Sequence, residues 1–444
     1  MLTPPEVYPL VVAWLQALDG PAHRTALHAL AQLLTALLVG QSLRSAGLMR
    51  ALLSLEGGSA RQGYRRVARA WTRPWLAPAW LTPRLVRVAV LLVAPDRPGP
   101  TAGQRHLALD SVRCGRWEVF VLGVVWYGRV LPVSWAVLPY PWPKRRFTPP
   151  VSALVRAVAA AWPAETPPPH LLGDRAFPSK RLFQTLGAVG WGYTVRLRAK
   201  SWVTVGGQAQ WVRALLATAQ LGRWTTAAAT YGSGPGAIAG TLIIGRGLPV
   251  LPWHQANAGS ARHRAAQQRK RQQHLRTKHR RAHPDASVET DAWVVLFTTH
   301  ATWRAATASY RRRWAIEGSY RDAQSGWDGQ HGWDLEPVLA RLPTAAQVER
   351  VVGLWALGAL VQTWVGVQVQ APSAPAGVRG VVRQWTTTGR LSVWAAGQLA
   401  LTEPSGRLHV WLPTTLQAGA ARIAPPAAPA RRRVRPRPPT QQAA

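Results

Sequence analysis

Apolar positions along the first 95 residues follow a helical pattern. Between Ala26 and Val39 they occupy most positions, which is typical of a helix that is buried on several sides. Ser59 and Gln62 have the spacing of a capping box and predict the start of a further helix. The pattern predicts an all-helical N-terminal domain, residues 1–95, followed by a linker at 96–104 that is rich in proline and glycine.

From His106 the pattern changes to short apolar runs that are typical of strands. The runs near Leu107, at 119–126 and at 130–138 predict three consecutive strands, with Tyr127-Gly128-Arg129 as a hairpin turn. Strands with interposed helices predict an α/β core, of which residues 105–200 form the first part. The remaining elements predicted in this part are a helix at 151–162, a strand that ends at Asp174, a helix at 179–187 and a strand at 193–198.

Residues 201–300 predict a β-rich insertion with strands at 236–244 and 293–299. Within it, residues 260–284 form a charged tract without an apolar face, which fits either a segment that follows nucleic acid or a disordered basic insertion.

Residues 301–370 predict helices that complete the core. The stretch 351–370 is long and apolar enough for a membrane-spanning helix, but glutamines interrupt it. The pattern therefore predicts a buried core helix. Beyond it lie a C-terminal region at 371–424 and a tail at 425–444, rich in proline and arginine, that is predicted to be disordered.

The segment from Tyr310 to Gln324 places one acid in an aromatic and basic stripe. If it forms one helix, Tyr310, Arg313, Glu317 and Gln324 share an arc of about 60°. An apolar strip beside this arc would hold the helix on a core. The alternative is a simple salt bridge between Glu317 and arginine. The strip consists of Ile316, Tyr320, Ala323 and Trp327.

Two further acids end apolar runs that have the composition of buried strands. Asp110 closes the run HLALD, and Asp174 closes HLLGD. Three carboxylates that converge from two strand ends and a helix would suit two Mg²⁺ ions, with Mn²⁺ as a substitute. The alternative for each aspartate is an ordinary cap or turn.

The charge balance is strongly basic, with 54 Lys and Arg against 18 Asp and Glu and a net charge of +36. Such a chain requires a polyanionic partner or high salt, and nucleic acid is the expected partner. Arg61 and Arg65, on the helix opened by Ser59, are candidate DNA contacts; the alternative is a solvated helix face. The single cysteine, Cys114, excludes an internal disulfide and a cysteine zinc site. No secretory signal is evident, and a cytoplasmic protein without a membrane segment is expected.

The ordered set Asp110, Asp174 in Asp-Arg-Ala-Phe, and Tyr310-x2-Arg313-x3-Glu317 resembles the three blocks of a bacterial DDE transposase of the insertion-sequence-four type. The resemblance covers roughly residues 55 to 365. It implies an RNase H-like catalytic core interrupted by a β-rich insertion, with Asp110, Asp174 and Glu317 as metal ligands and Tyr310 and Arg313 near the scissile phosphate. It also implies cleavage at the ends of a transposable element, strand transfer into target DNA, and a homodimer on paired ends.

Two positions test this resemblance further. Gln324 stands where the family pattern has a lysine, and Arg321, about 60° away on the helix, could supply that charge. Trp293 occupies a context similar to a family tryptophan that stacks on a flipped base, although a core role fits it equally. The rival interpretations are an RNase H-like nuclease without strand transfer and an inactive DNA-binding remnant of a transposon.

Overall fold

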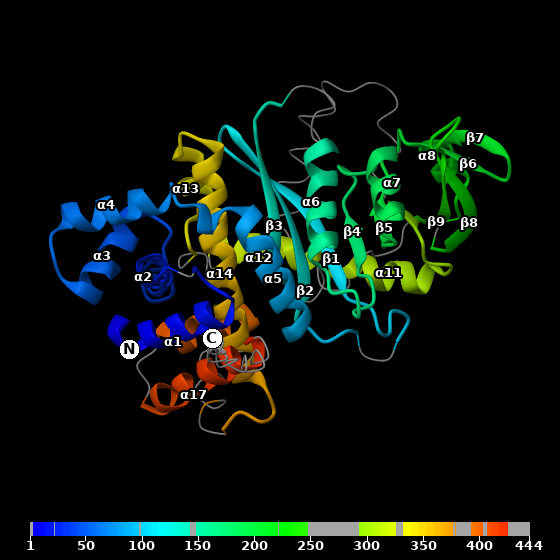
Figure 1. The fold of residues 1–444 in the computed structure, drawn as a ribbon. Coiled ribbons are helices and arrows are strands. Elements are labelled where there is room, and N and C mark those ends of the chain that lie inside the picture. Colours follow the sequence, from blue (N-terminus) through cyan, green and yellow to red (C-terminus); the bar gives the residue numbers. More distant parts are fainter. Residues whose placement is uncertain are drawn as a thin grey trace, which may run out of the picture.

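The computed structural model describes residues 3–21, 23–96, 99–142, 148–220, 222–246, 293–325, 332–375, 378, 392–402 and 406–424. The predicted basic tract at 260–284, the predicted disordered tail at 425–444 and Trp327 lie outside these residues. The described part is a mixed α/β structure with one ten-stranded sheet (Figure 1). The α/β class predicted from the sequence is therefore confirmed.

Helices form the N-terminal part of the chain, as the pattern predicts. The capping box is present, because Ser59 and the side chain of Gln62 bond each other's backbone N–H at the start of α4. This part has no core of its own, since Val7 and Leu33 belong to the same apolar core as Leu107 of the sheet. The elements are α1 (Pro4–Ala17), α2 (Arg24–Gly40), α3 (Ser45–Glu56), α4 (Ala60–Ala70), the short 3-10 helix η1 (Pro74–Leu76) and α5 (Pro78–Leu92).

The first half of the sheet has the strand order β3-β2-β1-β4-β5. The strands β1, β2 and β3 are antiparallel neighbours, while β4 runs parallel to β1 and β5 parallel to β4. Tyr127 and Gly128, both with positive φ, form the two-residue turn between β2 and β3. The strands are β1 (His106–Cys114), β2 (Trp117–Trp126), β3 (Arg129–Pro139), β4 (His170–Gly173) and β5 (Gly192–Arg196).

The inserted region continues the same sheet instead of forming a separate one. Its last strand, β10 (Trp293–Thr298), pairs with β5 and carries the order on through β9, β8, β6 and β7. The apolar pattern predicted β9 and β10 but not the other three strands of the insertion. The others are β6 (Trp202–Val205), β7 (Gln208–Trp211), β8 (Trp224–Tyr231) and β9 (Ile238–Arg246), with α8 (Val212–Thr218) after β7.

Helices cover both faces of the first half of the sheet (Figure 1). Neighbouring residues of β3 point to opposite faces: Ser134 bonds Thr82 of α5, whereas the Trp135 indole bonds the Glu349 carbonyl of α14. The helix α6 (Thr148–Ala161) lies beside α5, and α7 (Lys180–Ala188) lies beside α6. The other face carries α11 (Trp303–Arg312), α12 (Trp314–Ser325), α13 (Leu335–Arg341) and α14 (Ala345–Gln370).

The apolar helix α14 is a core helix, as its sequence predicts. Among the described residues it is the single helix that is by itself long and apolar enough to cross a membrane, and 89% of its most apolar window is buried in the protein. It crosses α16 (Val393–Thr402) closely at Gly366 and Gly397. A Cβ on Gly366 would lie 1.6 Å from the Val393 carbonyl oxygen, so a larger residue is excluded there. The last helix, α17 (Gly406–Ile423), packs on α1 and α14.

Two details of the predicted site elements are wrong. Asp110 does not end its strand, because pairing with β2 continues to Cys114. The predicted single helix from Tyr310 to Gln324 is two helices that meet at Arg313. There the amides of Arg313 and Ile316 bond carbonyls three residues back, at Tyr310 and Arg313. This tighter 3-10 geometry lies where the Arg313 side chain turns toward Asp110 of β1.

Three histidines form a cluster beneath α11: buried His106 and His170 begin the parallel strands β1 and β4, and half-buried His300 follows the end of β10. His106 and His300 both hydrogen-bond the Ser309 hydroxyl, at 3.0 and 2.8 Å, and His170 stacks on His300 with ring centroids 4.2 Å apart. Burial, with a contribution from Arg312, lowers the pKa of His106 to about 3, and burial lowers the pKa of His170 as well. Asp96 lies 3.5 Å from His106 but is already paired with Arg312 at 2.7 Å, so it does not hold the imidazole protonated.

This cluster predicts loss of stability in acid. An unfolded histidine binds its proton near pH 6.5, whereas folded His106 stays neutral down to about pH 3. The contribution of neutral His106 to the free energy of unfolding is therefore fully present above pH 6.5. It decreases as the pH falls below this value and is lower by about 2 kcal/mol at pH 5. The difference between the parent and His106→Gln in urea unfolding at pH 7 and pH 5 measures this loss, because Asp110, whose pKa burial raises to about 6, contributes a change of the opposite sign to both chains. His106→Gln, which keeps a partner for Ser309, should flatten the pH dependence; an unchanged slope would contradict the assignment.

Candidate functional site

The sheet register brings Asp110 and Asp174 side by side. Leu109 of β1 is paired with Gly173 of β4, so each aspartate is the next residue along its own chain. Gly173 is in turn paired with Val195 of β5, which places Arg196 next in the same row. In parallel strands, residues in register point to the same face of the sheet. The row Asp110, Asp174 and Arg196 therefore crosses three neighbouring strands, in the middle of β1, directly after β4 and at the end of β5.

The helices α11 and α12 bring Tyr310, Arg313 and Glu317 to this row. The Tyr310 hydroxyl donates to Oδ1 of Asp174 at 3.3 Å. Arg313 Nη1 lies 3.5 Å from Oδ2 of Asp110, and its Nη2 donates to Oε1 of Glu317 at 2.7 Å. All five residues of the predicted set thus meet in one place. The predicted salt bridge of Glu317 is also present, so the two interpretations of that residue are not exclusive.

Arg313 is the central cation of the cluster and is 2% exposed. Its guanidinium lies over the Trp314 ring, 4.7 Å from the ring centroid. Burial alone would lower its pKa, but Tyr310, Asp174, Asp110 and Glu317 raise it, and the net pKa is raised. Its Nε has no hydrogen-bond partner. One fixed cation therefore serves several carboxylates at once.

The positive charge of Arg313 does not fully offset the cost of burying the Asp110 carboxylate. Burial raises the pKa of Asp110 to about 6, against the lowering effects of Arg313 and of the Ser111 amide, which donates to Oδ1 at 2.9 Å. The carboxylates of Asp174 and Glu317 raise it further. Burial similarly raises the pKa of Tyr310 to about 12, so its hydroxyl remains a donor at neutral pH. The cluster has an excess of negative charge around one guanidinium.

The donor set fits a hard divalent cation. Asp110, Asp174 and Glu317 offer only carboxylate oxygens, which are the ligands that Mg²⁺ prefers. In the described part of the chain no three acidic, histidine or cysteine side chains are arranged to hold an ion, and Arg313 is bonded to two of these carboxylates. An ion would therefore replace Arg313 as the partner of at least one carboxylate. The uncompensated charge on Asp110 would favour that exchange.

The other predicted contacts are not part of this cluster. Arg321 is exposed on α12, and Gln324 is half-buried near its end. Trp293 is half-buried in β10 with the Arg196 guanidinium 5.5 Å from its ring centroid, so the structure places it in the sheet. Arg61 and Arg65 are exposed on α4, which packs on α2 and α3.

Sequence reasoning missed two arginines that follow Asp174 in space. Arg196 extends the row of site residues, and its Nη2 donates to the Trp293 carbonyl at 3.2 Å. Arg198 donates through Nε to the Arg175 carbonyl at 2.6 Å and so holds the turn after Asp174. The available signal was position, because both arginines stand in the strand predicted at 193–198, which the structure shows to run parallel to β4.

Neither a scan against protein-family models nor a search of curated proteins finds a match to this chain. The assignment of function therefore depends on the geometry of the site and on the sequence motif.

Proposed function

We propose that this protein is a DDE-type DNA transposase, which cuts DNA at the ends of a transposable element and joins the freed 3′-hydroxyl to target DNA. The observation that carries the proposal is the meeting of Asp110, Asp174 and Glu317 around Arg313. These residues lie far apart in the sequence, and the motif predicted their proximity. An incidental resemblance would give no reason for the three acids to meet.

The arrangement of the sheet supports an RNase H-like core. Three antiparallel strands are followed by two parallel ones in the order β3-β2-β1-β4-β5, with helices on both faces. The first acid lies on the central strand β1 and the second directly after β4. A β-rich insertion separates them from the helix that carries the third acid, as the resemblance implies.

The proposed site would hold two Mg²⁺ ions through Asp110, Asp174 and Glu317, with Mn²⁺ as a substitute. Such ions activate a water or a 3′-hydroxyl and stabilise the leaving oxygen of a phosphodiester. Cleavage adds water across one P–O bond and leaves a 3′-hydroxyl. In strand transfer that hydroxyl forms a new phosphodiester with target DNA while one target P–O bond breaks. The number of phosphodiester bonds is unchanged in the transfer, so no nucleotide cofactor is needed.

Tyr310 and Arg313 act on the carboxylates in the present arrangement. Both are 2% exposed, and their polar atoms point at Asp174, Asp110 and Glu317. They would orient these oxygens and limit the repulsion between them before DNA binds. The predicted grip on a phosphate would require Arg313 to leave at least one carboxylate, a step that a bound cation would favour.

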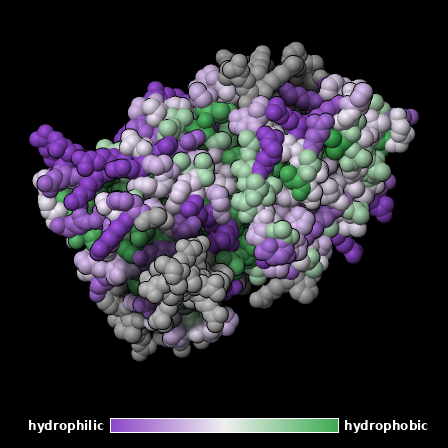
Figure 2. Space-filling view, viewed as in Figure 1, coloured by the Kyte–Doolittle hydropathy of each residue, from purple (hydrophilic) through white to green (hydrophobic). Residues whose placement is uncertain are grey.

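Double-stranded DNA, both element end and target, is the proposed partner, and a homodimer is the proposed state on paired ends. Arg61, Arg65, Arg66 and Arg69 are exposed on α4. Figure 2 shows hydrophilic side chains gathered over the end of the molecule that α4 forms. Arginines at successive turns of an exposed helix can neutralise phosphates. This surface would bind DNA, while the acid cluster would cut it.

A cleavage assay tests the proposal. The substrate is a labelled duplex taken from the DNA that flanks the reading frame, incubated with the full chain and either Mg²⁺ or EDTA. The proposal predicts Mg²⁺-dependent nicking or cutting at a defined end. Absence of any metal-dependent cleavage would favour the inactive DNA-binding remnant. Cleavage without joining of ends to a target would favour an RNase H-like nuclease.

A further prediction concerns the position where the family pattern has lysine. Gln324 is half-buried, whereas Arg321 is exposed on the same helix. We expect Arg321 to make the DNA contact, because an amide lacks the Coulomb attraction of a cation for phosphate. Arg321→Ala should weaken end binding or cleavage about tenfold or more, equivalent to about 1.4 kcal/mol. Gln324→Lys should increase end binding or cleavage only modestly.

Fluorescence anisotropy with the end duplex measures binding by both variants. A different result would contradict the prediction that Arg321 makes this DNA contact: the parent chain is inactive, Gln324→Lys makes it active, and Arg321→Ala has no effect.

A further inference from the structure

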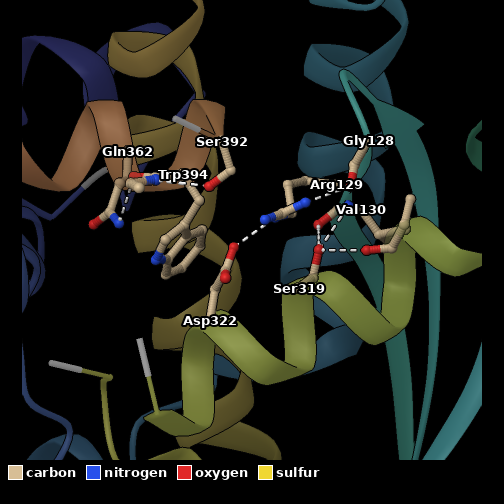
Figure 3. A network of polar contacts seen from close by, with 10 residues as sticks. Gly128, Arg129, Val130, Ser319, Asp322, Gln362, Ser392 and Trp394 are labelled. Carbon is tan, nitrogen blue, oxygen red and sulfur yellow. Dashed lines mark hydrogen bonds and ion pairs between the residues drawn. The ribbon is translucent and has the colours of Figure 1, made fainter. Parts of the chain in front are cut away.

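The helix that carries Glu317 is fixed to the β2–β3 hairpin by polar contacts that the acid cluster does not use. Asp322 of α12 accepts a hydrogen bond from Arg129 Nε at 2.5 Å, and Arg129 Nη1 also donates to the Gly128 carbonyl at 2.9 Å (Figure 3). The Asp322 side chain is 4% exposed and that of Arg129 20%. The pair is therefore a nearly buried ion pair between the hairpin and α12.

Ser319 makes a second link to the same hairpin. β3 is an edge strand, and the Val130 amide and carbonyl point away from β2. The Val130 amide donates to the Ser319 hydroxyl at 2.7 Å, and that hydroxyl lies 3.4 Å from the Val130 carbonyl oxygen (Figure 3). The hydroxyl's own proton has a nearer acceptor in the Ala315 carbonyl at 3.1 Å, so the bond from the Val130 amide is the firm link between Ser319 and the hairpin. Gly318 leaves room for the arginine, because a Cβ there would lie 3.0 Å from Arg129 Nη1.

These contacts lie on the side of α12 away from Glu317. At about 100° per residue, Gly318, Ser319 and Asp322 occupy an arc centred roughly opposite Glu317. A third face is apolar and holds the buried residues Ile316, Tyr320 and Ala323. Apolar burial is not directional, so by itself it fixes the rotation of a helix less strictly than hydrogen bonds do. Hydrogen bonds have angular preferences, so the polar links fix the rotation of α12 and with it the direction of Glu317.

We propose that Arg129 and Asp322, with Ser319, are positioning residues that hold Glu317 in the geometry needed for metal binding. This inference rests on the proposed function of the acid cluster. A buried ion pair is weak support for stability, since apolar replacements of similar volume are often tolerated. Its effect here is on the orientation of the third carboxylate. Partners that orient a metal ligand typically change affinity or activity about 10- to 100-fold when they are removed.

The test uses the full-length double variant Arg129→Met/Asp322→Asn, which keeps both side-chain volumes and leaves no unpaired charge. The control is Arg84→Met/Asp19→Asn, which makes the same two substitutions in a more exposed ion pair of 3.2 Å between α5 and the turn after α1. Titration calorimetry with MnCl₂ measures metal affinity without requiring catalysis. Thermal melts and anisotropy with the end duplex measure folding and DNA binding.

We expect the double variant to stay folded and to bind DNA, but to bind Mn²⁺ about tenfold more weakly, with cleavage partly rescued at high Mn²⁺. The control should match the unmodified chain. Unchanged Mn²⁺ affinity in the double variant, with only a lower melting temperature, would overturn the proposal. If the double variant does not fold, Arg129→Lys replaces it, since lysine still neutralises Asp322 but lacks the Nε contact; the same criteria apply.

Measurements on the parent chain and on Asp110→Asn distinguish failure of the proposed metal site from failure of the positioning role. Mn²⁺ binding that Asp110→Asn removes and the double variant leaves intact would overturn only the positioning role. A parent chain that binds no Mn²⁺ would overturn the metal site and the positioning role together.

Discussion

Asp110→Asn, Asp174→Asn and Glu317→Gln should each lower the rate of metal-dependent DNA cleavage about a thousandfold or more while leaving DNA binding within about twofold. The ions that these carboxylates would hold supply several kcal/mol of transition-state stabilisation, and each 1.36 kcal/mol is a factor of ten in rate. DNA affinity should survive because phosphate contacts from the exposed arginines provide it.

The measurement is single-turnover cleavage of an end duplex, with anisotropy for binding. Glu165→Gln, an exposed acid between α6 and β4, is the matched control and should behave like the parent. Retained Mg²⁺-dependent cleavage by any one of the three variants would remove that residue from the site.

Arg313→Met should destabilise the metal-free protein by about 3–5 kcal/mol, because it leaves buried carboxylates without their shared cation. Asp110 and Glu317 lose a direct ion pair, and Asp174 loses a nearby positive charge. If the three acids bind a divalent cation, Mn²⁺ should recover part of this loss and raise the melting temperature of the variant more than that of the parent.

Urea unfolding with and without MnCl₂ measures both effects. Arg312→Met is the neighbouring control, since the Arg312 side chain is 40% exposed and its ion pair with Asp96 should contribute only about 1 kcal/mol or less. An Arg313→Met variant as stable as the parent would show that the acids do not depend on this cation. Loss of stability without any recovery by Mn²⁺ would argue against the metal site.

Local patterns were sufficient to predict most elements of the first half of the sheet. The strands β1, β2 and β3 and the turn at Tyr127 and Gly128 follow from apolar runs and a turn that needs positive φ. The capping box at Ser59 was equally local. Each of these patterns spans only a few neighbouring residues, so it predicts its element without knowledge of the fold.

Features that depend on tertiary contacts were not predicted. The break at Arg313 comes where its guanidinium reaches Asp110, a residue two hundred positions earlier in the chain. The link between Arg129 and Asp322 also joins distant segments, and each residue alone resembles an ordinary surface charge. The continuous sheet through β10 depends on pairing with β5 across the whole insertion.

The candidate site itself was predicted by motif and not by periodicity. Spacing along a helix placed Tyr310, Arg313 and Glu317 on one face, but nothing local placed Asp110 and Asp174 beside them. The register of β1 and β4 supplies that proximity. The pairing of β4 with β5 places Arg196 beside Asp174, and nothing in the local sequence indicates this proximity.

Strand transfer tests the central claim most directly. A labelled duplex ending in a recessed element end with a free 3′-hydroxyl is incubated with the full chain, a supercoiled plasmid and Mg²⁺. We expect the label to become covalently joined to plasmid DNA. EDTA should prevent the joining, and Asp110→Asn, Asp174→Asn and Glu317→Gln should each abolish it. Joining that persists in those three variants, or a chain that binds and cuts the end but never joins it to the plasmid, would contradict the proposal of a transposase with this site.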